Sequence, residues 1–226
     1  MTPSFFVTLV GWCIWLSTAA AAIDPPPGSV LLEGEAGRPA LLLLHGRGRH
    51  PRWKVVEPLR RAVHRELGWT TLSLQMPAED KPWRAYAKDF PRAWAVIESA
   101  LKFVRRKEGA KRVYLLGHSM GARMAAAYLA AHPEAPVDGL VVIGCRNNGG
   151  APLDCRQSLE TVERPVLDLW GGADTKDKRA GRQRRHLRSD RYTQMEIAGA
   201  SHRFEGHEQA LTTAVVEWLK KRTQHP

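Results

Sequence analysis

Short apolar runs alternate along the chain with longer segments in which apolar side chains recur every three or four residues. A continuous apolar run is typical of a strand buried on both faces, whereas the three-to-four spacing is typical of an amphipathic helix. The clearest run is "ALLLLH" at 40–45. In the segment 55–67 that follows it, Val56, Leu59, Val63 and Leu67 lie on one stripe. Repeated strand–helix alternation of this kind predicts parallel βαβ units, and therefore an α/β fold.

The same periodicities predict a mostly parallel central sheet with helices on both faces. The expected strands are 30–32, 40–45, 70–74, 113–116, 139–143, 166–170 and 192–197. The expected helices are 55–67, a long helix within 83–108 that begins near Pro91, 120–132, 176–187 and 207–221. The segment 144–161 is expected to be rich in loops.

The first residues predict an export signal. From Phe5 to Ala22 no side chain is charged, and small residues precede Asp24 and a proline cluster. This pattern predicts a signal peptide over 1–22, a linker over 23–29 and a single domain over 30–226. An uncleaved anchor is the alternative, because the run approaches the length that spans a bilayer and no Lys or Arg precedes it. Either way the folded part is expected outside the cytoplasm, in the periplasm or secreted.

Removal of that segment leaves two cysteines, Cys145 and Cys155. In an oxidising compartment a close pair of this kind often forms a disulfide, and the alternative is two free buried thiols. The bridge is the prediction. The short loop that it closes would stabilise the fold by about 2–3 kcal/mol in the chain-entropy description.

Composition indicates one ordinary globular domain with a basic surface. The chain has 226 residues, of which 43% are apolar and 25% charged, and a formal net charge of +11. The basic segment from Lys176 to Arg191 is either a solvated helix face or a contact for anionic envelope lipids or polysaccharide.

Nucleic acid is not expected as a partner, since no motif for reading nucleic-acid sequence is present. No metal and no cofactor are expected, because neither ligand spacing nor a phosphate-binding glycine loop occurs.

The sequence "GHSMG" at 117–121 directly follows a predicted strand and opens a predicted helix. A serine at such a sharp turn is strained and exposed, and glycines at Gly117 and Gly121 let the neighbouring backbone pass closely. The helix that begins at Met120 points its first amides toward any oxyanion formed there. Ser119 is therefore the candidate nucleophile, and the alternative is an ordinary tight turn.

Candidates for an acid and a base follow two later strands. Asp174, in "GGADTKD", follows the strand 166–170, and the alternative is that it only caps the next helix. Asp177 is the reserve acid, whereas Asp168 is disfavoured because it lies within a strand. His202, in "GASH", follows the strand 192–197 and is the candidate base, with His207 in reserve.

Ser119, Asp174 and His202 occur in the chain order of the α/β-hydrolase superfamily. With the dipeptide His45-Gly46 after an early strand, the chain resembles that superfamily over most of its length, and "HGRGRHPRW" is similar to a poorly characterised bacterial branch. The resemblance implies an oxyanion hole formed by the amides of Met120 and Arg47, each donor contributing about 3 kcal/mol to transition-state stabilisation. His45 and His118 are expected to hold loops in place.

These residues predict a serine hydrolase that cleaves carboxylic esters through an acyl-enzyme intermediate. A thioesterase or peptidase with the same triad, and a non-catalytic protein that binds an envelope component, are the alternatives. Only a short loop lies between 143 and 166, where relatives often insert a cap domain, so the site is expected to be open. Trp53, Trp83 and Trp170 are candidates for its lining.

Overall fold

The computed structural model describes residues 24–224. The predicted signal peptide lies outside the described residues, as does the first residue of the predicted linker. Within the part that is described, no helix is both long and apolar enough to cross a membrane.

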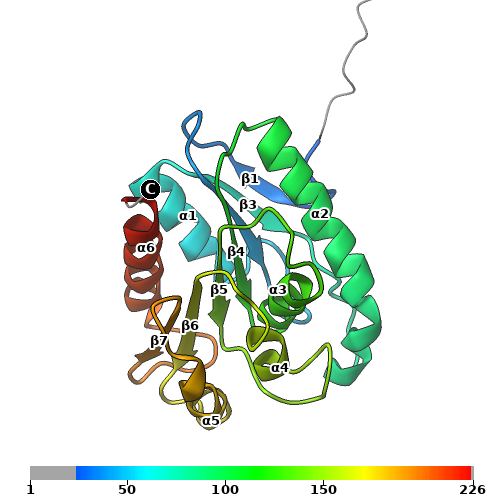
Figure 1. The fold of residues 1–226 in the computed structure, drawn as a ribbon, viewed down its shortest axis with the longest axis vertical. Helices are drawn as coiled ribbons and strands as arrows, with labels where there is room; N and C mark the ends of the chain where they lie inside the picture. Colours follow the sequence, from blue (N-terminus) through cyan, green and yellow to red (C-terminus); the bar gives the residue numbers. More distant parts are fainter. Residues whose placement is uncertain (1–23, 225–226) are drawn as a thin grey trace, which may run out of the picture.

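Seven strands form one twisted sheet in the order β1-β3-β2-β4-β5-β6-β7 (Figure 1). Only β1 runs antiparallel to its neighbour, and every other pair is parallel. The strands are β1 (Val30–Leu32), β2 (Ala40–Leu44), β3 (Thr70–Leu74), β4 (Val113–His118), β5 (Gly139–Ile143), β6 (Val166–Gly171) and β7 (Tyr192–Ile197). This confirms the predicted α/β fold with a mostly parallel sheet.

Helices cover both faces of the sheet (Figure 1). They are α1 (Val56–Leu67), α2 (Phe90–Arg106), α3 (Met120–Ala131), α4 (Cys155–Leu159), α5 (Thr175–Gln183) and α6 (Glu208–Gln224), with two 3-10 turns, η1 (Trp83–Asp89) and η2 (Arg185–Leu187). Helices α1 and α6 pack together on one face, and α2 and α3 lie on the other.

The apolar run of β2 explains this layering. Its alternate side chains enter two separate cores: Leu42 and Leu44 pack on the α2–α3 side, and Leu41 and Leu43 pack on the α1–α6 side. All four are fully buried. A strand covered on both faces favours apolar side chains at successive positions, which is why the run shows no alternation in the sequence.

The structure adds two elements that the sequence did not predict. Residues 83–89 form η1 ahead of α2, and the short helix α4 begins at Cys155 within the segment expected to be loop-rich. Asp154 caps α4 by accepting hydrogen bonds from the amides of Arg156 and Gln157. No cap domain lies between β5 and β6, since α4 is the only element there.

Candidate active site

Ser119 lies at the sharp turn between β4 and α3, with φ 55° and ψ −112°. A non-glycine residue with positive φ is strained and is held only by its surroundings. Here the Ser119 amide donates a 2.8 Å hydrogen bond to the Ile143 carbonyl at the end of β5. A Cβ on Gly117 would lie 2.5 Å from the Ala122 backbone, and one on Gly121 would overlap the Leu44 carbonyl oxygen. The glycines on either side are therefore required by the close approach of backbone.

His202 lies on the loop between β7 and α6 and faces Ser119. Its Nε2 is 3.0 Å from the Ser119 Oγ, and its Nδ1 is 2.6 Å from the Asp177 Oδ2. An ionised carboxylate only accepts, so Nδ1 carries the proton and donates to Asp177. Nε2 is then free to accept from the serine hydroxyl, which is the orientation that a general base needs. The structure thus brings the predicted nucleophile Ser119 and the predicted base His202 into contact.

The expected acid, Asp174, is not the partner of His202. Asp174 is the N-cap of α5, and its carboxylate accepts a 2.8 Å hydrogen bond from the Asp177 amide. Asp177 stands one turn further along the helix, fully buried, and reaches the imidazole. The capping role that was the alternative for Asp174 is what the structure shows, and the reserve residue Asp177 takes the position beside His202.

Arg146, on the loop after β5, holds both carboxylates. Its Nε donates to the Asp177 Oδ1 at 2.7 Å, and its Nη2 reaches Asp174 at 3.1 Å. Burial alone would raise the pKa of Asp177, but the hydrogen bonds and charges of His202 and Arg146 outweigh burial and lower that pKa below its ordinary value. Asp177 is therefore ionised at neutral pH.

Asp174, Asp177 and His202 also form a group whose ligand atoms lie within 4.8 Å of one another. Spacing of this kind can suit a metal ion. Here Arg146 and His202 already donate to these carboxylates, and a cation would have to displace the guanidinium.

The loop after β2 brings Gly46 and Arg47 beside the serine. A Cβ on Gly46 would lie 3.3 Å from the Ser119 Cβ, a tight contact that glycine avoids as the loop passes the serine. His45 fixes the loop: its Nδ1–H donates to the Gly46 carbonyl at 2.9 Å, and its Nε2 accepts from the Met76 amide at 3.1 Å. Burial lowers the pKa of His45 to about 4, so the ring is neutral and can fill both roles.

His118 performs a similar task for the loop that carries the base. Its Nε2–H donates a 2.9 Å hydrogen bond to the His202 carbonyl. Burial, and secondly the charge of His202, lowers the pKa of His118 to about 3. A neutral ring that binds backbone groups stabilises a loop, so these contacts are consistent with the expected loop-holding role of both histidines.

A disulfide joins Cys145 and Cys155, as predicted. It closes the loop that carries Arg146 and the neighbouring Asn147. A second anchor is Arg184, fully buried, which donates to the Cys145 carbonyl at 2.8 Å and forms an ion pair with the equally buried Asp168 at 2.7 Å. Arg184 also donates to the Asn147 Oδ1, so the loop is held on both sides of Arg146.

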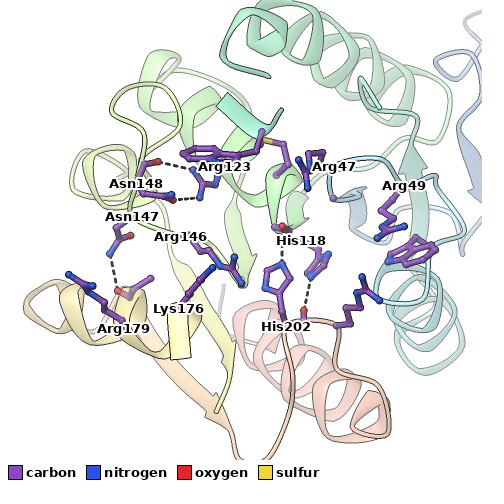
Figure 2. A pocket seen from close by; sticks show the side chains of 18 of the residues that line it. Arg47, Arg49, His118, Arg123, Arg146, Asn147, Asn148, Lys176, Arg179 and His202 are labelled. Atoms are coloured by element: carbon purple, nitrogen blue, oxygen red, sulfur yellow. Dashed lines mark hydrogen bonds between the residues drawn. The ribbon is translucent and has the colours of Figure 1, made fainter. Parts of the chain in front are cut away.

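A cavity of about 660 Å³ opens over Ser119 and His202 (Figure 2). Arg47 and Met120, whose amides were expected to form the oxyanion hole, both line it, as do Trp53 and Trp83. The prediction for Trp170 is wrong: its indole packs against Gly181 and donates to Glu196, away from the cavity.

Two arginines of this region were missed in the sequence. Arg146 has no local signal, because its partners lie 28 and 31 residues further along the chain. Arg123 does carry one: it is the only charged residue in the alanine-rich helix α3, whose positions are almost all buried. A charged residue at such a position is rarely buried without a specific partner, which marks it for attention.

The fold is the α/β-hydrolase fold, as the likeness to solved structures shows. The dienelactone hydrolase from Anabaena variabilis superposes with a TM-score of 0.71 and 21% identity, over 85% of this chain and 90% of that one. Est1E from Butyrivibrio proteoclasticus gives 0.68 and 15%, over 87% and 94%. A Xanthomonas campestris protein, described as a serine hydrolase without lid, gives 0.68 and 19%, over 87% and 91%.

The family can be stated more narrowly. Residues 82–221 match the family described as "Protein of unknown function (DUF3530)", and the chain belongs to that family. A curated relative from Serratia proteamaculans, 2-succinyl-6-hydroxy-2,4-cyclohexadiene-1-carboxylate synthase, is 32% identical over 106 residues, which is 46% of this chain. The match spans only 37% of that relative's length.

Proposed function

We propose that this protein is a serine hydrolase that cleaves carboxylic esters, with Ser119 as nucleophile, His202 as general base and Asp177 as the acid that orients it. The observation that carries the proposal is the continuous chain of hydrogen bonds from Ser119 through His202 to a buried, ionised Asp177. Strain at Ser119 supports it, because positive φ in a serine needs a reason and exposure of a nucleophile is one.

The reaction proceeds in two halves. As the Ser119 Oγ forms a bond to the ester carbonyl carbon, its proton passes to His202 Nε2, and the carbonyl oxygen becomes an oxyanion. The C–O bond to the alcohol then breaks, and His202 returns the proton to the leaving alkoxide. Water attacks the acyl-serine by the same route, giving the carboxylic acid and free Ser119.

The amides of Arg47 and Met120 are the proposed oxyanion donors. Both residues line the cavity at Ser119, and Met120 is the first residue of α3, where helix amides are unpaired and the dipole is positive. The close approach of Gly46 to Ser119 brings the neighbouring Arg47 within the same region.

The proposed location and partners rest on the sequence and on one structural feature, the disulfide. The N-terminal pattern and the Cys145–Cys155 disulfide favour a periplasmic or secreted protein. Contact with an anionic envelope surface through the segment from Lys176 to Arg191 is the proposed interaction. In that segment Arg184 is buried in an ion pair, so the remaining cations would have to carry it.

A screen of short- and medium-chain aryl esters, with matched thioesters and anilides, tests the proposal. Wild type should turn over the oxygen esters fastest, and Ser119→Ala should lose about 10⁴-fold or more in turnover. Faster cleavage of thioesters or anilides would move the assignment to a thioesterase or peptidase. Full turnover by Ser119→Ala would refute the serine mechanism, and no turnover by either protein would favour a binding protein.

A further inference from the structure

The cavity over Ser119 is lined by an unusual excess of positive charge. Seven of its lining residues are lysines or arginines, and no aspartate or glutamate lines it among the described residues. In Figure 2, Arg123, Arg146, Lys176 and Arg179 lie on one side of His202, and Arg47 and Arg49 lie on the other.

One of these charges is already compensated. Arg146 is paired with Asp174 and Asp177. In contrast, Arg123, Lys176 and Arg179 form no ion pair with any described carboxylate, and we call these three residues the cationic cluster. Lys176 and Arg179 lie on α5. On the same helix, but outside the cavity, Lys178 forms an ion pair with Glu196 at 3.0 Å, so carboxylates are within reach of this helix.

Arg123 is the member of the cationic cluster whose charge is least exposed to solvent. Its side chain is 6% exposed, and its guanidinium donates to the carbonyls of Asn148 and Leu153 at 2.9 and 2.6 Å. The ring of Trp83 lies 5.1 Å from it. These partners are neutral, and no described carboxylate forms an ion pair with the guanidinium, although Asp154 and Asp177 act on its charge from further away. Burial, and secondly the charge of Arg146, lowers the pKa of Arg123 to about 10, which leaves it charged at neutral pH.

A buried charge without a directly paired counter-ion is costly, and an anion entering the cavity would relieve that cost. Lys176 and Arg179 stand at the exposed rim of the same cavity, one helical turn apart on α5. The two rim cations can attract an anion from solvent, and Arg123 supplies a charge where water is largely excluded. Guanidinium groups pair well with carboxylate and phosphate oxygens.

We infer that the substrate is an anionic ester, whose carboxylate or phosphate group is bound by the cationic cluster while Ser119 attacks the ester carbonyl. The inference rests on the proposed hydrolase function for the reaction, but the anion site itself can be tested without turnover. Neutral apolar esters would bind this cavity without satisfying its charges, and they should be poor substrates.

Calorimetric titration of inorganic phosphate into Ser119→Ala tests the anion site alone. The further substitutions Lys176→Gln and Arg179→Gln, both at exposed positions, should weaken binding about tenfold. Lys220→Gln with Lys221→Gln removes the same net charge from exposed positions of α6 and should change the affinity less than twofold. Equal weakening by both pairs, or no saturable binding at millimolar phosphate, would overturn the site.

Two pairs of esters then tell which part of the substrate carries the anion. In the first pair, p-nitrophenyl hemisuccinate and the neutral p-nitrophenyl butyrate differ by a charge on the acyl part. In the second pair, butyryl glycerol phosphate and the neutral butyryl glycerol differ by a charge on the alcohol part. One pair should show at least about a tenfold preference in kcat/KM for the anionic member, and Lys176→Gln with Arg179→Gln should abolish it. If both neutral esters are cleaved as well as the anionic ones, the anionic substrate is wrong and the hydrolase stands. If phosphate binds but no ester is cleaved, the proposed hydrolase function fails and the anion site stands.

Discussion

Asp174 and Asp177 lie three residues apart at the start of α5, and their environments give them different tasks. Asp174 is partly exposed and satisfies the first turn of the helix, whereas Asp177 is fully buried between His202 and Arg146. An N-cap carboxylate faces back along its own helix, and the residue at the third helical position faces whatever packs against that first turn. Only the second geometry reaches the imidazole.

The two aspartates form a matched pair of substitutions. Asp177→Asn should lower ester turnover by about 10⁴-fold, because a neutral amide no longer fixes the tautomer of His202 or stabilises its protonated form. Asp174→Asn keeps a good capping residue and should retain turnover within about tenfold. Steady-state kinetics on both variants, with circular dichroism to show that they are folded, gives the answer. The reverse order of the two losses would return the role to Asp174.

At the scale of elements, the sequence predicts strands better than it predicts irregular connections. The strands 70–74, 139–143 and 192–197 are predicted to the residue, because each is a short apolar or alternating run with clear flanking breaks. Helix α4 is missed: it is five residues long, too short to show a periodicity, and it is held by Asp154 and by the burial of Cys155 and Leu159.

The helix predicted over 176–187 ends earlier in the structure because of a tertiary contact. In the structure α5 ends at Gln183, and Arg184 turns into the interior to pair with Asp168. Nothing local in a run of basic residues distinguishes the one arginine that becomes buried. The same limit applies to the site: Ser119 and His202 follow from motif and chain order, but the choice between Asp174 and Asp177 depends on how α5 packs.

The disulfide gives a prediction at this scale. Replacing both Cys145 and Cys155 by serine should lower the free energy of unfolding by about 2–3 kcal/mol, because the closed loop restricts the unfolded chain. Urea denaturation of the variant and of the oxidised wild type measures the difference. Turnover of the folded variant should change little at low temperature, since Arg184 still anchors the same loop. Identical denaturation midpoints would show that the bridge does not contribute.

At the scale of the whole molecule, two buried neutral histidines link stability to pH. The pKa of His45 is lowered to about 4 and that of His118 to about 3, whereas both groups titrate near 6.5 in an unfolded chain. Between these values the unfolded state binds more protons than the folded state. The stability that these two neutral histidines contribute is therefore fully present above about pH 6.5. It is lost as the pH falls, by about 1.4 kcal/mol per pH unit for each histidine.

His118→Gln isolates one of these contributions, since an amide can still donate toward the His202 carbonyl but does not titrate in this range. Between about pH 6 and pH 4.5 its stability should fall less steeply than that of wild type, by about 1.4 kcal/mol per pH unit. Urea denaturation at several pH values gives both slopes. Parallel slopes would mean that His118 is not held neutral in the folded protein.

The claim on which the whole account depends is that Ser119 is an activated nucleophile. Reaction with a fluorophosphonate probe, followed by mass spectrometry of the digested protein, tests this directly and needs no knowledge of the substrate. A single adduct is expected on the peptide that contains Ser119, absent from Ser119→Ala and much slower to form in His202→Gln. An unlabelled wild type, or equal labelling of wild type and Ser119→Ala, would contradict it.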